Sequence, residues 1–241
     1  HLDRYHIRED LTIFQNREEL HSVLVSGGQT KKWLGEFFDV SVPVKLYQQI
    51  QEHGGDNPFS TRSNPARLMA VDWVSSQGFL VTVPKECKDI LQSSLLESGL
   101  QDSTDEMINY LRLQQGWPLG NDIPEKTLPQ EVGLNARAIS LTKGCYLGQE
   151  TVARLDALGH VNRRLVVLAV EKGGSMVVGD SVASNDEVVS RVTSVGCLGN
   201  QAVSLAMTII PLKSMQQKSN LTVAGKAANV VSPVLLDTLM T

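Results

Sequence analysis

The stretch Lys143-Gly144-Cys145-Tyr146-Leu147-Gly148-Gln149-Glu150 determines the fold and function that we expect of this 241-residue chain. It places Cys145 in a glycine-flanked turn ahead of residues 149–158, which predict a helix. The helix N-terminus and the Lys143 cation are expected to lower the pKa of the thiol from about 8.5 to roughly 7 or below. The plainer alternative is a small, buried, unreactive cysteine. Glu150 and Arg154 have the i,i+4 spacing of a helical ion pair.

The residues before this stretch predict a mixture of strands and helices. Glycine, asparagine, serine and proline in residues 52–66 predict an exposed loop, and three prolines in residues 117–136 predict an ordered loop. Periodicity and turn signals give the elements between them. Strands are expected at 7–14, 20–26, 66–73 and 78–83, and helices at 30–38, 85–98 and 104–115.

The pattern of apolar residues changes after about residue 160. Short runs of β-branched residues, separated by turn residues, predict a small barrel or sandwich. We therefore expect an α+β protein with a domain boundary near residues 159–162, dividing it into domains 1–159 and 160–241. The strands of the second domain are expected at 165–170, 175–178, 188–192, 202–206 and 221–223.

The composition argues against several classes of protein function. The net charge of -4 argues against a dedicated nucleic-acid binder, although a local basic patch stays open. Cys87, Cys145 and Cys197 are too few and too widely spaced for a disulfide framework or a zinc site, so free thiols and no metal are predicted. No apolar run is long enough to span a bilayer and the N-terminus is polar, so we expect no membrane partner and a cytoplasmic protein.

Residues 143–150, extended by Thr151-Val152-Ala153-Arg154, resemble the signature of the YgfZ-type folate-binding proteins, which are relatives of the glycine-cleavage T-protein. That signature reads K-G-C-[YF]-x-G-Q-E, followed by a V-A-R-like segment. Further matches extend the resemblance over much of the chain. They are Gly78-Phe79, Leu111-Arg112-Leu113 with Gly116, Pro118 and Gly120, then Pro129, Glu131, Gly133 and Leu134, then Ile139-Ser140, and finally Asn162-Arg163-Arg164-Leu165.

The resemblance implies a T-protein-like region of ferredoxin-like lobes followed by a small C-terminal β-barrel. It implies tetrahydrofolate or a derivative as ligand, and a role in making or maintaining iron–sulfur clusters, including those of a tRNA-thiolating radical enzyme. Iron–sulfur proteins or their assembly machinery are the implied partners, in the cytoplasm or, in a eukaryote, the mitochondrial matrix. By the same resemblance, Cys145 is the functional thiol and Lys143 tunes it. The implied ligand-binding residues are Arg112, Gln114, Tyr146, Gln149, Glu150 and Arg154.

The sequence departs from this pattern in two ways. Residues 2–7 resemble a segment that family members carry after a substantial N-terminal portion, so we expect the folate-binding region to be incomplete at its N-terminus. The T-protein stretch R-x-x-L-R-x-E-A-G has Ile108 in the place of its first arginine and Gln114 in the place of its glutamate. The glutamate bonds the pterin as an anion, whereas Gln114 can bond it only without the charge.

Three interpretations stay open at this point. The first, which we favour, is a non-catalytic folate-binding accessory protein for iron–sulfur enzymes. The second is a tetrahydrofolate-dependent one-carbon transferase of the T-protein type, which the departures at Ile108 and Gln114 disfavour. The third is a binding module in which Cys145 is only structural. A charged surface is the preferred interpretation of three arginines, Arg154, Arg163 and Arg164. The alternative is a site for a polyglutamate tail or RNA.

Overall fold

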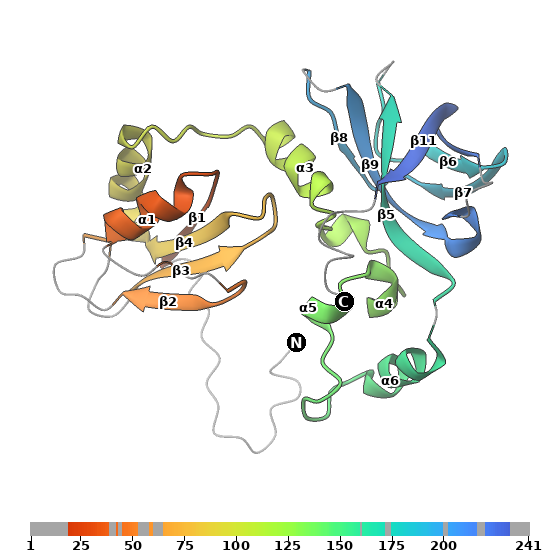
Figure 1. The fold of residues 1–241 in the computed structure, drawn as a ribbon, viewed down its shortest axis with the longest axis horizontal. Coiled ribbons are helices and arrows are strands. Elements are labelled where there is room, and N and C mark those ends of the chain that lie inside the picture. The colour runs from red at the N-terminus through yellow and green to blue at the C-terminus, as the bar shows by residue number, and fades with distance from the viewer. Residues whose placement is uncertain are drawn as a thin grey trace. The chain divides into compact units, whose positions relative to one another are not determined.

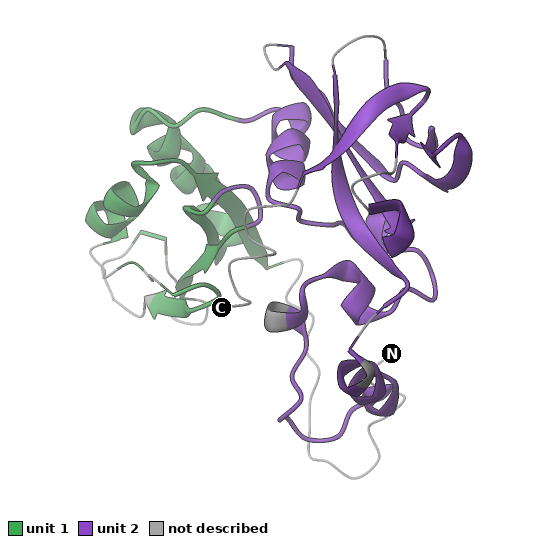
Figure 2. Ribbon diagram, turned by 45° about the vertical axis from the view of Figure 1, so that its right-hand side comes forward, with its two compact units in different colours: residues 1–72, 76–102 green, residues 73–75, 103–241 purple. Residues whose placement is uncertain are grey.

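The protein is described by a computed structural model covering residues 19–38, 42, 45–52, 58–59, 65–159, 161–171, 175–199, 202–215 and 220–231. Figure 2 colours its two compact units: unit 1 is residues 1–72 and 76–102, and unit 2 is residues 73–75 and 103–241. Within the described ranges, no helix has the length and apolar character to cross a membrane. The strand predicted at 7–14 lies outside these ranges.

Unit 1 is a four-stranded antiparallel sheet with two helices, as Figure 1 shows. The strands predicted near 20–26, 66–73 and 78–83 and the helices predicted at 30–38 and 85–98 are confirmed. The second helix begins with a short 3-10 turn, Lys85–Cys87. The sheet order is β1-β4-β3-β2. The elements are β1 (Leu20–Ser26), α1 (Thr30–Phe38), β2 (Gln49–Glu52), β3 (Ala66–Val71), β4 (Gly78–Pro84) and α2 (Lys88–Glu97).

The core of unit 1 lies on one face of this sheet. Alternate residues of β3 and β4, such as Leu68 and Val81, are buried together with Leu34 of α1 and Leu91 of α2. Two-residue alternation is what a sheet with one packed face requires. β2 was not predicted, because its sequence Gln-Ile-Gln-Glu is mostly polar and its strand conformation depends on pairing with β3.

The first part of unit 2 is helical. The predicted helix near 104–115 is confirmed as α3 (Asp105–Gln114), and the Thr104 hydroxyl caps it by accepting from the Met107 N–H at 3.2 Å. The ordered loop predicted at 117–136 is wrong in detail, because it contains short helical turns. These are η3 (Gly120–Asp122), α4 (Pro129–Val132) and the start of α5 (Asn135–Ala138). The predicted helix at 149–158 is confirmed as α6 (Gln149–Leu158).

The second part of unit 2 is a seven-stranded antiparallel sheet, with the order β7-β6-β10-β11-β5-β9-β8. Within the described ranges the end strands β7 and β8 do not pair, so a closed barrel is not confirmed. Side chains join β7 to β9 instead: the Ser190 and Thr208 hydroxyls lie 2.7 Å apart, and Thr208 donates to the Arg191 carbonyl. The strands are β5 (Arg163–Glu171), β6 (Ser181–Ser184), β7 (Glu187–Arg191), β8 (Ser194–Gly196), β9 (Val203–Pro211), β10 (Leu221–Val223) and β11 (Lys226–Val231).

One predicted strand is wrong. Residues 175–178 form no strand, because the Asp180 carboxylate accepts from the Val177 N–H at 2.9 Å and Gly179 adopts φ +95°. These two features make a turn, and the strand begins only at Ser181. The sequence had suggested a strand because residues 176–178 are apolar, but Val177 and Val178 are exposed.

Both faces of strands β5 and β9 are buried. Val166 and Leu168 point into the core inside the curled sheet, whereas Leu165 and Val167 pack against Tyr110 of α3 on its outer face. Two-sided burial explains why these strands read as continuous apolar runs. It also explains why the compact units divide near residue 102, and not at residue 159. Compactness does not test which segments fold independently, so the predicted domains 1–159 and 160–241 stay a prediction.

Candidate functional site

Cys145 lies in the segment that joins α5 to α6. Its side chain is exposed and its thiol is free. The backbone before it is held by the Ser140 hydroxyl, which accepts from the Lys143 N–H at 3.2 Å. The segment then turns into α6 at Gly148, which adopts φ +89° as the residue before the helix and therefore favours glycine. The structure thus presents the thiol outward on a defined turn.

Lys143 and Tyr146 are brought together within this turn. The Lys143 ammonium lies 4.4 Å from the centroid of the Tyr146 ring, which is cation–π geometry. Tyr146 is partly buried, and its carbonyl accepts from the Gln149 N–H at 3.2 Å. Lys143 was predicted to act on Cys145, but its described contact is with the aromatic ring. Its tuning of the thiol stays a prediction.

The predicted pair on α6 does not form. Glu150 and Arg154 are both exposed, and the structure shows no ion pair between them. Water competes well for such exposed charges, so the i,i+4 spacing alone is a weak determinant. The helix is held by its opposite side, where Val152 is buried and its carbonyl accepts from the Gln130 amide at 2.9 Å. The described contacts of α6 therefore lie on the side that holds Val152.

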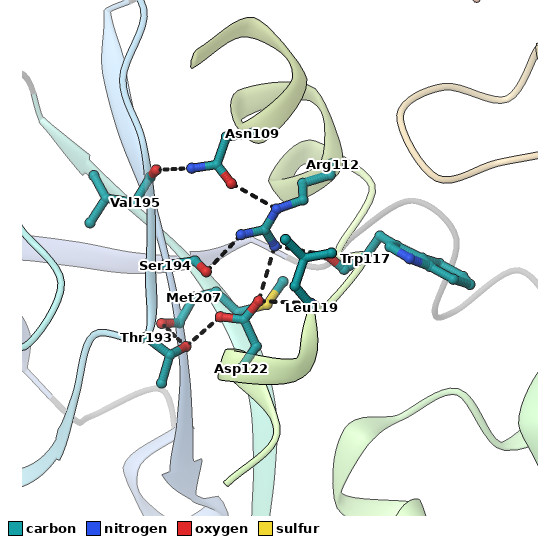
Figure 3. Close-up of polar contacts among 9 residues, drawn as sticks. All are labelled: Asn109, Arg112, Trp117, Leu119, Asp122, Thr193, Ser194, Val195 and Met207. Atoms are coloured by element: carbon teal, nitrogen blue, oxygen red, sulfur yellow. Dashed lines mark hydrogen bonds and ion pairs between the residues drawn. The ribbon is translucent and has the colours of Figure 1, made fainter. Parts of the chain in front are cut away.

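Arg112, predicted to bind a cofactor, is buried in a polar network (Figure 3). Its Nε donates to Asn109 Oδ1 at 2.7 Å, and its Nη2 donates to the Ser194 hydroxyl at 2.6 Å. Its Nη1 donates to both the Trp117 carbonyl and Asp122 Oδ2 at 3.0 Å. Every nitrogen of the guanidinium has a protein partner. The predicted role in cofactor binding would require this network to break.

Asp122 is the buried counterion of this network, and its side chain has no exposed surface. It also accepts from the Leu119 N–H at 2.9 Å and lies 2.6 Å from the Thr193 hydroxyl. Burial lowers the pKa of Arg112, and the charge of Asp122 opposes that shift. Sequence reasoning missed Asp122 and Ser194. The one local signal was the i,i+3 spacing that puts Asn109 and Arg112 on the same face of α3.

A second ion pair attaches α4 to the sheet. Glu131 is buried and accepts from Arg163 Nε at 2.8 Å, while its other oxygen accepts from the Leu128 N–H at 2.9 Å. Hydrogen bonding to Glu131 raises the pKa of Arg163. Arg163 is therefore held at the start of β5 by an ion pair, while its side chain stays partly exposed, in keeping with the charged surface read from the sequence.

Gln114 is the last residue of α3 and is exposed. Among the described residues, no hydrogen bond, ion pair or ring contact joins Gln114 or Arg112 to residues 143–150. The structure therefore brings together Lys143 and Tyr146 and places Gln149, Glu150 and Arg154 on the helix that follows. It does not bring Arg112 to them.

Comparison with known proteins finds YgfZ proteins by sequence and an aminomethyltransferase by structure. A tRNA-modifying protein YgfZ from Colwellia psychrerythraea is 48% identical over 62 residues, which are 25% of this chain and 19% of the relative. A YgfZ of the same description from Aliivibrio fischeri is 31% identical over 192 residues, covering 74% of this chain and 57% of the relative. The predicted resemblance to the YgfZ-type proteins is confirmed. No protein-family model matches the chain.

The chain also shares the fold of a solved aminomethyltransferase. The glycine cleavage system aminomethyltransferase T from Bartonella henselae superposes with a TM-score of 0.71 at 20% identity, over 90% of this chain and 59% of that one. The chain thus spans less than two thirds of the length of each of these proteins. The predicted α+β, T-protein-like fold is confirmed at this level, while the ferredoxin-like lobes and the N-terminal incompleteness stay predictions.

The residues that match the YgfZ-type pattern fall into two groups in the structure. Arg112, Glu131 and Arg163 form buried or partly buried ion pairs that fix helices to the sheet. Cys145 and Glu150, by contrast, are exposed. Within the described ranges, no group of three or more histidine, cysteine or acidic side chains has the arrangement of a metal site.

Proposed function

We propose that this chain is a folate-binding accessory protein in the synthesis or repair of iron–sulfur clusters, with Cys145 as its functional thiol. The observation that carries the proposal is the free, exposed Cys145 on a turn held by Ser140 and Gly148, beside the Lys143–Tyr146 pair. The YgfZ relatives, which are described as tRNA-modifying, support clients among tRNA-modifying radical enzymes. Such a protein acts in the cytoplasm or, in a eukaryote, in the mitochondrial matrix.

The residues of unit 2 suit tetrahydrofolate chemically. A pterin edge alternates hydrogen-bond donors and acceptors, and the Gln149 amide and the Glu150 carboxylate, which are neighbours on α6, supply both kinds of group. In this proposal Gln114 of α3 is a further ligand residue. The Tyr146 ring offers a stacking surface, and the exposed Arg154 offers a cation for a glutamyl carboxylate. Bound tetrahydrofolate would supply a carrier of one-carbon units. We exclude Arg112 from this set, because Asp122 and its other partners use its donors.

Exposure of Cys145 favours a partner protein as its target. A solvent-facing thiol can reach a sulfur or metal centre carried by another protein, which a buried thiol cannot do. Lys143 stabilises the turn through the Tyr146 ring and keeps positive charge near the segment. In this proposal the chain binds the folate and presents the thiol, and the iron–sulfur client or assembly machinery supplies the cluster.

The alternative function is a tetrahydrofolate-dependent one-carbon transferase. It is favoured by the fold shared with an aminomethyltransferase. It is disfavoured by Gln114 and Ile108, which stand where the T-protein pattern has a glutamate and an arginine. Both of these side chains are exposed on α3. Formation of methylene-tetrahydrofolate from an aminomethyl donor by the purified protein would favour this alternative over the accessory role.

The deciding experiment is complementation of a strain that lacks the gene, with iron–sulfur enzyme activities as the readout. Cys145→Ser is compared with Cys197→Ser, which removes a second exposed thiol from the same unit. We expect Cys197→Ser to restore the activities and Cys145→Ser to fail, although both accumulate as folded protein. Full rescue by Cys145→Ser would make the thiol structural. Unchanged activities in the deletion strain would refute the iron–sulfur role itself.

A further inference from the structure

Helix α6 is attached to the rest of unit 2 at few points. Of its side chains that the structure describes, Val152 alone is buried. Among the described residues, the hydrogen bond from Gln130 to Val152 is the one side-chain hydrogen bond or ion pair that joins α6 to another element. Figure 1 shows α6 apart from the sheet of unit 2 and next to α4. The orientation of the helix therefore depends on one apolar contact and one hydrogen bond.

The two ends of α6 are glycines in a left-handed conformation. Gly148, before the helix, has φ +89°, and Gly159, after it, has φ +78°. A Cβ added at either position would have open space among the described residues, so packing does not fix these two ends. Glycine also has more backbone freedom than any other residue. The two ends can therefore act as pivots, and the contact at Val152 decides how the helix is rotated between them.

The hydrogen bond from Gln130 is directional, whereas the apolar contact is not. The amide nitrogen of Gln130 donates to the Val152 carbonyl at 2.9 Å. Burial of the Val152 side chain is compatible with any rotation that keeps it covered, because the hydrophobic effect has no direction. A hydrogen bond, by contrast, weakens steeply as its angle departs from linear. The Gln130 amide therefore fixes the rotation of α6.

Gln130 itself is held in place by the sheet. It lies between Pro129 and Glu131 at the start of α4. The buried Glu131 carboxylate accepts from Arg163 of β5 at 2.8 Å. The link from Gln130 to α6 therefore starts from an anchored element.

The backbone of α6 extends this link to the Cys145 turn. The Val152 N–H donates to the Gly148 carbonyl at 3.2 Å, and the Gln149 N–H donates to the Tyr146 carbonyl at 3.2 Å. Val152 thus bonds α4 through its carbonyl and the residue before the helix through its N–H. Tyr146 is the chain neighbour of Cys145. A rotation of α6 would therefore move the thiol.

The Gln130 amide contributes little to the stability of the fold. Its Oε1 is buried and has no hydrogen-bond partner among the residues that the structure describes. An unpaired buried acceptor costs at least as much free energy as a typical hydrogen bond contributes. The Val152 carbonyl lies inside α6, where helix geometry already supplies a partner. An apolar side chain of the same size would stabilise the fold equally well, so the amide matters for the orientation that it gives to α6.

We propose that Gln130 is a positioning residue for the Cys145 thiol and acts on it through α6. The inference rests on the proposed function, in which Cys145 meets a centre carried by a partner protein. Such a reaction requires a defined direction of the thiol as well as its exposure. A displacement of about 1 Å at a reacting group can lower a rate by roughly a hundredfold, although the fold is unchanged.

The test is Gln130→Met, which removes the amide and nearly keeps the size of the side chain. Hydrogen exchange should show protection of the Gln149 and Val152 amides lowered at least tenfold, with the amides of β5 and β9 unchanged. The midpoint of thermal unfolding should stay within about 3 °C of wild type. Complementation should fail, as for Cys145→Ser. Gln115→Met, the same change at another partly buried glutamine of unit 2, should match wild type in all of these measurements.

Two further variants separate the donor from the rest of the side chain. Gln130→Glu keeps the shape but has no donor at neutral pH, and it should fail as Gln130→Met does, which provides a second test if the methionine variant does not fold. Gln130→Lys restores a donor and should recover protection and complementation. Wild-type protection and full complementation in Gln130→Glu, equal failure of the lysine and methionine variants, or a uniform loss of protection throughout unit 2 would each overturn the proposal.

Hydrogen exchange is measured on the purified chain and needs no client protein. Full rescue by Cys145→Ser would therefore refute the proposed function, while a local loss of protection in Gln130→Met would still support the link from α4 to the Cys145 turn. Unchanged protection in a folded Gln130→Met would refute the link itself, whatever the role of the thiol.

Discussion

Replacement of Arg112 by leucine is the sharpest test of the buried network. The side chain of Asp122 has no exposed surface, so removing Arg112 leaves a carboxylate in the interior without its counterion. Breaking a buried ion pair from one side costs about 3–5 kcal/mol of unfolding free energy. For a chain of this size, that loss lowers the midpoint of thermal unfolding by roughly 6–20 °C. We expect Arg112→Leu to fall in this range.

The assay must report on unit 2, because a chain with two compact units need not unfold in one step. Hydrogen exchange of the amides of α3 and β8 provides this, since both elements are held by the network. Urea unfolding followed by circular dichroism gives the free energy. Arg154→Leu is the matched control: that arginine is exposed on α6, and we expect a change within about 0.5 kcal/mol.

The double variant separates charge from packing. In Arg112→Leu with Asp122→Asn, the amide oxygen can still accept from the Leu119 N–H, and no buried charge is left. We expect it to recover at least half of the stability lost by Arg112→Leu. A loss below about 1 kcal/mol in Arg112→Leu, as for an exposed pair, would refute the reasoning. So would weakened folate binding with unchanged stability, because that result would make Arg112 a ligand residue.

Three further predictions use local features. Gly196→Ala should destabilise the protein by about 1–3 kcal/mol in urea unfolding, because its Cβ would lie 2.9 Å from backbone and side-chain atoms of α3. Gly120→Ala, which has open space at its Cβ, should leave the free energy of unfolding unchanged. A thiol reagent with mass mapping should label the exposed Cys145 rapidly and Cys87 only on unfolding, because burial, reinforced by a neighbouring glutamate, raises the pKa of the Cys87 thiol. Burial and a nearby lysine lower the pKa of His21, so the unfolded chain binds the proton better than the folded chain does. Stability should therefore rise with pH up to about 6.5. His21→Gln should flatten the pH dependence of the unfolding midpoint between about pH 5 and 7.

Much of the secondary structure could be predicted from local signals. The helix at 149–158 and the strand at 20–26 match their observed bounds, because each has a clear start, stop and apolar period. β2, β8 and β11 were missed for a common reason. Their residues are polar, few or weakly apolar, and their conformation is fixed by a partner strand that is distant in sequence. Local propensity carries no information about such a partner.

The candidate site was predictable only in part. The glycine-bounded turn that holds Cys145 was predicted from its local sequence, whereas the exposure of its thiol is known only from the structure. The position of Arg112 does not, because its partner Ser194 lies 82 residues away in the chain. An arginine next to leucines on a helix is compatible with a ligand site or with a buried ion pair, and only the tertiary structure decides between them.

Residues that match the family pattern can be required for stability or for function, and Arg112 and Cys145 illustrate the two cases. The arginine of the Leu111-Arg112-Leu113 match and the glutamate of the Pro129–Val132 turn are buried at 5% and 4% exposure, and each holds a helix to the sheet of unit 2. Their retention in a sequence pattern follows from the cost of leaving a buried charge unpaired, whatever the protein binds. No such cost applies to Cys145, whose side chain is exposed and forms no described contact that stabilises the fold. A requirement for its thiol therefore has to come from function, which is why the Cys145→Ser and Arg112→Leu variants should fail in different assays.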